Sequence, residues 1–253
     1  MKKLAPEQCD SLMKSVSRHP CGSVYPLSVL ENRQSGEAFG DGESALLWHY
    51  CGFAYLFGRC DEALLERVYS EFLMAEGLPR RFVLFVQEGS TEQFFKSKQG
   101  LSFGIRYGFE YASSPAELPT AMPDSCGLQS LDDKLFDTLD GRVTPRFSWR
   151  DKEQFEQGGA GFCVVCDGTP ASWAFSAAVS SDEVDIGVET TEHYRHKSLA
   201  ALAAEQMIEY TLLQGKRPVW ACDSGNTASR KLAEKLGFSV TAQYITIRKN
   251  NNP

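Results

Sequence analysis

The second half of the chain alternates between strand and helix periodicity, and this alternation restricts the fold more than any other feature. Residues 183–190 read EVDIGVET, with apolar side chains at every second position, as in a strand with one apolar face. Residues 199–214 form a mostly apolar helical pattern, residues 218–222 a strand pattern and residues 226–236 a second helical pattern. This order predicts an α/β (α+β) fold, in which helices flank a mixed central sheet.

The remaining patterns suggest two domains. Strands are predicted before and after the hairpin signal Asp167-Gly168, and at 238–249. The first half shows strand, helix and strand patterns at 45–58, 61–77 and 81–89, which indicates a smaller α/β layer. A run rich in Pro, Ser and Gly at 113–127 precedes a short helix that we expect Ser130 to cap. We therefore expect an N-terminal domain over 1–120 and a second domain over 121–253.

Charge and hydropathy exclude several classes of protein. Lys and Arg number 26 against 33 Asp and Glu, and neither half is basic, so we expect no nucleic-acid or membrane partner. No apolar run approaches the roughly 20 residues needed to cross a bilayer. Polar residues and Pro6 occupy the place where a signal peptide would be apolar, so we expect a cytoplasmic protein.

The cysteines and histidines give little sign of a metal site. The eight cysteines are irregularly spaced, and we expect free thiols. Cys163 and Cys166 have the spacing of metal and redox sites, but a strand would send their sulfurs to opposite faces, and no second such pair completes a zinc site. His193 and His196 lie in a polar turn, where we expect them to face solvent or phosphate. No metal is predicted.

Four segments in a fixed order resemble the GNAT superfamily of N-acetyltransferases: EVDIGVET, RHKSLA at 195–200, PVWACD at 218–223 and NTASRKLAEKLGF at 226–238. The resemblance covers about the last 100 residues, and the combination is more specific than any one motif. A closer likeness is to the two-domain branch that includes zwittermicin-resistance-like acetyltransferases. The resemblance implies a GNAT fold, acetyl-CoA as cosubstrate and transfer of its acetyl group to a primary amine of a small molecule.

A short turn into a helix leaves the first N–H groups of the helix unpaired, with the positive end of the helix dipole behind them, and this arrangement can bind an anion. An ordinary strand-turn-helix is the alternative. The resemblance implies that the turn holds the pyrophosphate of coenzyme A and that the preceding strand pairs with pantetheine through its main chain. The implied binding residues are Val188, Glu189, Thr190, Arg195, His196, Lys197, Ser198, Leu199, Ala200 and Asn226. Asn226 could instead be a plain helix cap. Ser198 replaces a glycine of the family pattern, so it either adopts negative φ or weakens the phosphate site.

The resemblance implies that Asp185 is the best candidate for the base that takes the proton of the amine, because many relatives have a catalytic or substrate-orienting carboxylate at this strand position, ten residues before Arg195. Glu183 and Glu189 on the same strand face are further candidates. Solvated carboxylates on a strand are the alternative. Ala233 occupies the position of the general-acid tyrosine of many relatives, which leaves Ser229, Tyr194 or water as substitutes.

Two functions therefore stay open: an N-acetyltransferase, or a non-catalytic protein that binds or senses acyl-CoA. For the enzyme, we expect the aromatic run 48–57 of the N-terminal domain to contribute acceptor specificity.

Overall fold

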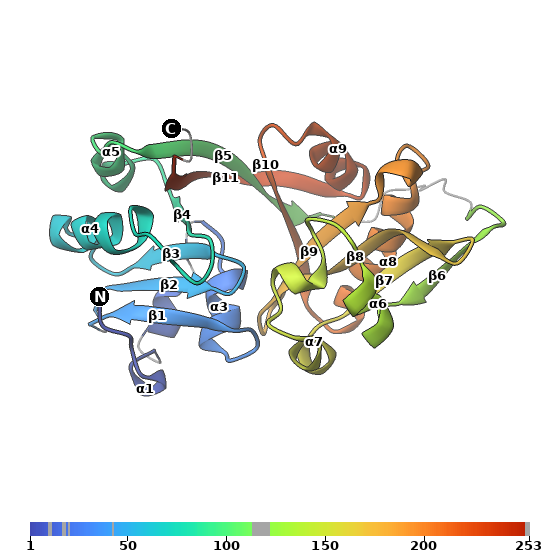
Figure 1. The fold of residues 1–253 in the computed structure, drawn as a ribbon, viewed down its shortest axis with the longest axis horizontal. Helices are drawn as coiled ribbons and strands as arrows, with labels where there is room; N and C mark the ends of the chain where they lie inside the picture. Colours follow the sequence, from blue (N-terminus) through green and yellow to red (C-terminus); the bar gives the residue numbers. More distant parts are fainter. Residues whose placement is uncertain (10–11, 17–18, 20, 42, 113–121, 251–253) are drawn as a thin grey trace. The chain divides into compact units, whose positions relative to one another are not determined.

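The structure is a computed structural model that describes residues 1–9, 12–16, 19, 21–41, 43–112 and 122–250 (Figure 1). The chain packs as two compact units. The first consists of Met1–Gly108, Asp223–Gly225 and Thr241–Pro253, and the second of Phe109–Cys222 and Asn226–Val240. The chain passes from one unit to the other within β5 (Leu101–Tyr111) and β11 (Phe238–Lys249), and also at both ends of Asp223–Gly225, a short segment of the first unit. The division into an acceptor-binding domain 1–120 and a catalytic domain 121–253 stays a prediction.

The first unit is a sheet with helices on both faces. Its strands follow the order β1-β2-β3-β4-β11-β5, in which β3 and β4 are parallel and the β1–β2, β2–β3 and β4–β11 pairs are antiparallel. The strands are β1 (Gly36–Gly40), β2 (Ala45–His49), β3 (Phe53–Phe57) and β4 (Val83–Val86). The helical segments are α1 (Pro6–Cys9), α2 (Met13–Val16), α3 (Val24–Leu30), α4 (Glu62–Val68), a π-helical turn η2 (Tyr69–Leu73) and α5 (Ser90–Lys96).

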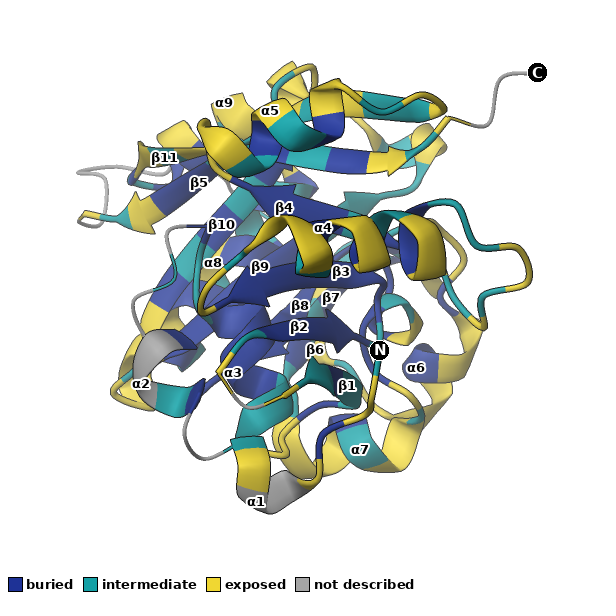
Figure 2. Ribbon diagram, turned by 90° about the vertical axis from the view of Figure 1, so that its left-hand side faces the viewer, coloured by how far each residue is buried: buried dark blue, intermediate teal, exposed yellow. Residues whose placement is uncertain are grey.

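The aromatic run of this unit forms its core. Every residue of β2 and β3 is buried (Figure 2), because helices cover both faces. On one face Trp48 packs in a cluster with Phe72 of η2, and on the other Tyr25 of α3 contacts Phe53, with ring centroids 5.1 Å apart. The run 48–57 therefore stabilises the unit through packing. Its contribution to acceptor specificity stays a prediction.

The second unit contains a mixed sheet in the order β10-β9-β8-β7-β6, in which β9 and β10 are parallel and the other neighbours antiparallel. The strands are β6 (Cys126–Ser130), β7 (Gly161–Cys166), β8 (Thr169–Val179), β9 (Glu183–Thr190) and β10 (Arg217–Asp223). The helices are α6 (Asp133–Thr138), α7 (Lys152–Gly158), α8 (Leu199–Leu213) and α9 (Thr227–Lys235), with 3₁₀ turns η3 (Pro145–Phe147) and η4 (Glu192–Tyr194). The predicted α/β fold with helices flanking a mixed sheet is confirmed.

The hairpin predicted from its two turn residues is confirmed. Asp167 and Gly168 have φ of 50° and 76°, the left-handed pair that a tight hairpin requires, and they join β7 to β8 as predicted. The predicted cap Ser130 is wrong, because Ser130 ends β6 and the Asp132 side chain accepts the Leu135 N–H at 2.9 Å. Residues 113–121 of the predicted connecting run lie outside the described residues. None of the described helices is long and apolar enough to cross a membrane.

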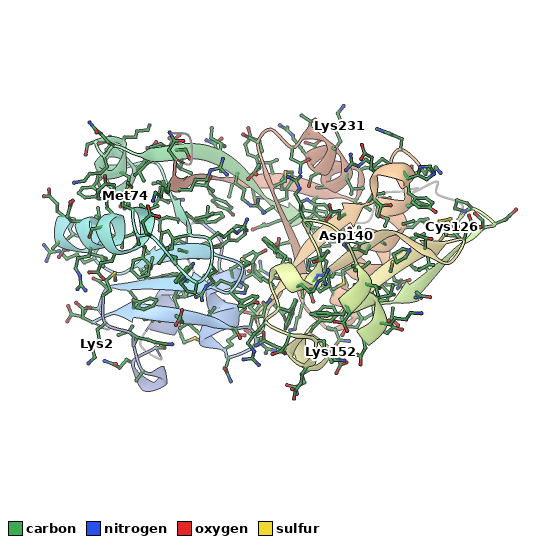
Figure 3. The ribbon with its side chains drawn as sticks, in the orientation of Figure 1. Lys2, Met74, Cys126, Asp140, Lys152 and Lys231 are labelled. Carbon is green, nitrogen blue, oxygen red and sulfur yellow. A yellow bond between two sulfur atoms is a disulfide. The ribbon has the colours of Figure 1, made fainter. Side chains whose placement is uncertain are left out.

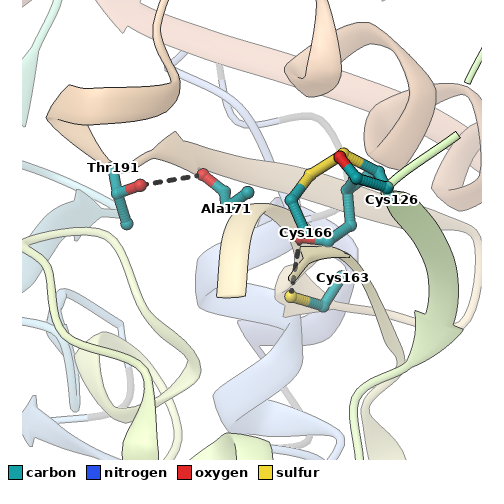
Figure 4. The surroundings of a disulfide bond; sticks show 7 residues. Cys126, Cys163, Cys166, Ala171 and Thr191 are labelled. Atoms are coloured by element: carbon teal, nitrogen blue, oxygen red, sulfur yellow. Dashed lines mark hydrogen bonds between the residues drawn. A yellow bond between two sulfur atoms is a disulfide. The ribbon is translucent and has the colours of Figure 1, made fainter. Parts of the chain in front are cut away.

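The prediction of free thiols is wrong for two cysteines. Cys126 of β6 lies directly opposite Cys166 of β7, and the two form a disulfide (Figure 4). The spacing of Cys163 and Cys166 is typical of a metal or redox pair, but Cys166 bonds to a different cysteine. Its partner Cys126 is 40 residues away in sequence and lies beside it across the sheet. Cys163 is a free and fully buried cysteine, and burial raises the pKa of its thiol to about 12, as expected for a packing residue.

The disulfide should stabilise the second unit. A cross-link over 40 residues restricts the unfolded chain, so its reduction should cost about 2–4 kcal/mol in the free energy of unfolding. Urea unfolding of the wild type with and without dithiothreitol measures this cost. The double variant Cys126→Ala/Cys166→Ala is the control, because its unfolding midpoint should not respond to the reductant. Equal midpoints for the oxidised and reduced wild type would contradict the prediction.

Candidate functional site

Strand β9 of the second unit pairs with its parallel neighbour β10 only over the first part of its length. β9 and β10 pair at Glu183–Arg217, Val184–Pro218 and Asp185–Val219. Beyond these pairs β9 runs on to Thr190 and β10 to Asp223 without further pairing to each other. The two strands therefore part after Asp185, and β9 presents an open main-chain edge on that side.

The register with β8 shows which peptide groups face this open edge. Thr191 N–H donates to Ala171 O at 3.0 Å, and Thr191 Oγ1 also donates to that oxygen (Figure 4). Because peptide groups alternate in direction along an antiparallel strand, Glu189 also points its main chain toward β8. Val188 and Thr190 then point their N–H and C=O groups toward the side that β10 has left. Of the three predicted main-chain ligands, two face the opening and Glu189 does not.

The turn after β9 leads to an exposed helix start. Arg195, His196, Lys197 and Ser198 are all exposed, and α8 begins at Leu199. Within a helix the N–H groups of its first turn have no carbonyl partner, and the described residues show no acceptor for those of Leu199 and Ala200. Together with the two cationic side chains, these N–H groups form a site of positive potential, suited to an anion.

Ser198 keeps the backbone conformation of the glycine that it replaces. Its φ is 59° and its ψ is 11°, in the left-handed region, and its hydroxyl makes no cap hydrogen bond to the helix. The predicted alternative with negative φ is therefore wrong. His196 also has positive φ, 64°, so two of the four residues between η4 and α8 adopt a conformation that costs a side-chain-bearing residue about 1–2 kcal/mol.

Asn226 caps α9. Its Oδ1 accepts the Ser229 N–H at 3.1 Å, which is the plain helix-cap role, while its exposed Nδ2 group keeps its donor capacity. Ser229 in turn accepts the Trp220 indole N–H at 3.0 Å, so its own hydroxyl proton is available to donate elsewhere. Ala233 is fully buried and supplies no acid.

The three carboxylates of β9 have different surroundings. Asp185 is 5% exposed, which rules out a solvated strand carboxylate. Both faces of β9 are covered at Asp185, so the single apolar face that the sequence suggested is also wrong there. Glu183 forms an ion pair with Arg217 at 2.8 Å, and Glu189 accepts the Val143 N–H at 2.5 Å. Glu183 and Glu189 are thus engaged in structural contacts, and Asp185 lies where the strands part.

The contact between Glu189 and Val143 has no signal in the sequence. Val143 belongs to the segment between α6 and α7, and its C=O accepts the Trp173 indole N–H at 2.8 Å. Trp173 faces Glu189 across β8 and β9. No group of three or more His, Cys, Asp or Glu among the described residues is placed to hold a metal ion.

Comparison with known proteins shows the family and the fold of the chain. The sequence profile of the GNAT acetyltransferase family matches residues 23–247. The uncharacterized N-acetyltransferase YdfB of Bacillus subtilis (strain 168) is 26% identical over 169 residues, a match that spans 65% of each protein. The structure is similar to a GCN5-related N-acetyltransferase-like protein from Streptococcus suis 89/1591, with a TM-score of 0.74, 25% identity and 96% and 98% of the two chains covered.

An acetyltransferase from the GNAT family of Colwellia psychrerythraea shares the fold, with a TM-score of 0.62, 11% identity and 98% of each chain covered. The fold, the parted strands and the family match together place this chain in the GNAT acetyltransferase family.

Proposed function

We propose that the chain transfers the acetyl group of acetyl-CoA to a primary amine of a small molecule. The observation that carries the proposal is the parting of β9 from β10, because it leaves the peptide groups of Val188 and Thr190 on an open edge that leads directly to the helix start at Leu199. Amide groups of the pantetheine arm can pair with such an edge as an added strand would. The pyrophosphate then lies at the turn, where Arg195 and Lys197 supply charge.

The chemistry follows from this placement. The amine nitrogen attacks the thioester carbon, the C–S bond breaks with its electron pair going to sulfur, and the proton of the amine passes to Asp185 directly or through one water. Coenzyme A can leave without a dedicated acid, since a free thiol has a pKa of about 8.5 and its thiolate is a good leaving group. The absence of a tyrosine at Ala233 is therefore compatible with turnover.

A non-catalytic protein that binds or senses acyl-CoA is the second candidate. The low exposure of Asp185 and the alanine at 233 favour it, because a buried carboxylate is harder for an acceptor to reach. A panel of primary amines separates the two functions: an arylalkylamine, a polyamine, an aminoglycoside and an amino-acid amide, each tested for free-thiol release from acetyl-CoA. Release with any amine supports the enzyme, and binding without release supports the sensor.

A cytoplasmic location and membership of the zwittermicin-resistance-like branch stay predictions.

Ser198 provides a test of the phosphate site. Ser198→Gly should keep or tighten acetyl-CoA binding, because glycine adopts positive φ without steric cost. Ser198→Leu should weaken binding by about tenfold, or ~1.4 kcal/mol, since a bulky side chain obstructs the approach of phosphate. Isothermal titration calorimetry gives the affinities, and melting temperatures without ligand show whether each variant is folded. Equal affinities for all three proteins would mean that phosphate binds elsewhere.

Asp185→Asn provides a test of the base. Asparagine keeps the shape of the buried side chain and removes its basicity, so turnover should fall by about 10²- to 10⁴-fold while acetyl-CoA affinity stays nearly unchanged. For the wild type, turnover should rise with pH and then level off, because the base must be deprotonated and no acid is required.

Glu183→Gln is the matched control for this test, because Glu183 forms its ion pair with Arg217 at the paired end of the same strand. Its turnover should stay within about threefold of wild type, small beside the typical loss of a general base. A comparable result for Asp185→Asn would remove Asp185 from the mechanism.

A further inference from the structure

One residue of the segment between α6 and α7 has both of its peptide groups held by side chains of the sheet. The Val143 N–H donates to Glu189 Oε2 at 2.5 Å, and the Val143 C=O accepts the Trp173 Nε1–H at 2.8 Å. Glu189 and Trp173 face each other on β9 and β8, so their side chains lie on the same face of the sheet. Val143 is thus held from both sides by one cross-strand pair.

The fit around this pair is close. A Cβ atom added to Gly141 would lie 2.5 Å from Glu189 Oε2 and 3.1 Å from Trp173 Cζ2. We call residues 139–144 the clamped loop. Its ends, Leu139 and Thr144, are buried, while Asp140 (Figure 3) and its neighbours Gly141 and Arg142 are exposed. The middle of the loop therefore reaches solvent, and the Glu189–Trp173 pair fixes its position.

The clamped loop lies on the same sheet face as Asp185. Side chains alternate along β9, so Glu189 and Asp185 point to one face and Val188 to the other. Helix α8 covers the face of Val188, because Phe162 and Ala174 share that face in the register and the Phe162 ring contacts Tyr210 of α8 at 6.0 Å. An amine that passes its proton to Asp185 has to approach from the opposite face, where the clamped loop is held.

We propose that Glu189 is a positioning residue for the acceptor amine. With Trp173 it holds the clamped loop as one wall of the amine's approach, and its carboxylate neither binds acetyl-CoA nor takes the proton. This inference rests on the proposed acetyl transfer. A loop that is free to move loses acceptor affinity, because the bound geometry then has to be ordered each time an amine binds.

Two different changes should release the clamped loop. Glu189→Leu removes the acceptor of the Val143 N–H. Gly141→Ala places a Cβ atom 2.5 Å from Glu189 Oε2, so either the loop or the carboxylate has to move and their contact is disturbed. Both should raise KM for the best amine of the panel by about tenfold or more, with KM for acetyl-CoA within about threefold of wild type. Glu189→Gln retains an oxygen acceptor for the Val143 N–H, so its KM for the amine should stay close to that of wild type. Gly127→Ala is the matched control, because nothing lies within 4 Å of the added Cβ atom.

Hydrogen exchange tests the clamp without relying on activity. The Val143 amide should exchange faster in Glu189→Leu than in wild type, and Glu189→Gln should retain its protection. Unchanged exchange in Glu189→Leu overturns the clamp. Faster exchange with an unchanged KM for the amine overturns its role in acceptor binding. A raised KM for acetyl-CoA alone would make Glu189 a cosubstrate ligand, and loss of turnover in Glu189→Gln with an altered pH profile would make it the base.

Failure of the proposed function gives a different result. In that case the unsubstituted protein binds acetyl-CoA and releases no thiol with any amine of the panel. The proposed role of Glu189 in acceptor binding then fails together with the proposed acetyl transfer. In the outcomes described above, the wild type is active, and the kinetics and hydrogen exchange of the variants test Glu189 alone.

Discussion

The parting of β9 from β10 is the constraint on which the rest of the site depends. Three parallel pairs join the two strands at one end, and beyond Asp185 the described residues show no further pairing on the β10 side of β9. An open edge inside a sheet normally invites pairing with another chain. Here the edge leads into a turn and a helix start of positive potential, and the proposed binding of acetyl-CoA depends on this continuity, because its amides would pair with the edge and its phosphates would lie at the turn.

The sequence predicted the elements of the second unit because their signals are local. The alternation of EVDIGVET, the left-handed pair Asp167-Gly168 and the glycine after α9 each follow from a few neighbouring residues. The sequence could not predict the disulfide, the cap of α6 or the hydrogen bonds that Glu189 and Trp173 make with the main chain of Val143. The disulfide and the Val143 hydrogen bonds join residues that are distant in sequence and are brought together by the fold of the sheet. The cap of α6 is Asp132 and not Ser130 because β6 continues through Ser130.

Ser198 shows how far a family pattern can be carried over. The position expects glycine because its backbone is left-handed, and the structure retains that backbone with a serine. The strain is of order 1–2 kcal/mol, which a domain with an extensive core can sustain. The turn is thus fixed by its surroundings, β9 before it and the first turn of α8 after it, more than by the residue at 198. Leu199 is only 1% exposed and anchors that first turn.

The three carboxylates of β9 illustrate why function depends on position relative to the strand opening. Because side chains alternate along a strand, Glu183, Asp185 and Glu189 share one face. The sequence pattern therefore does not show which of the three carboxylates acts as the base. Glu183 lies where β10 is still paired and neutralises Arg217, and Glu189 lies at the far end and holds Val143. Asp185 is the last residue before the strands part. In the proposed transfer, the cosubstrate begins at the turn and follows the open edge of β9 toward this point. Asp185 is the proposed base because the topology places this carboxylate where that path ends.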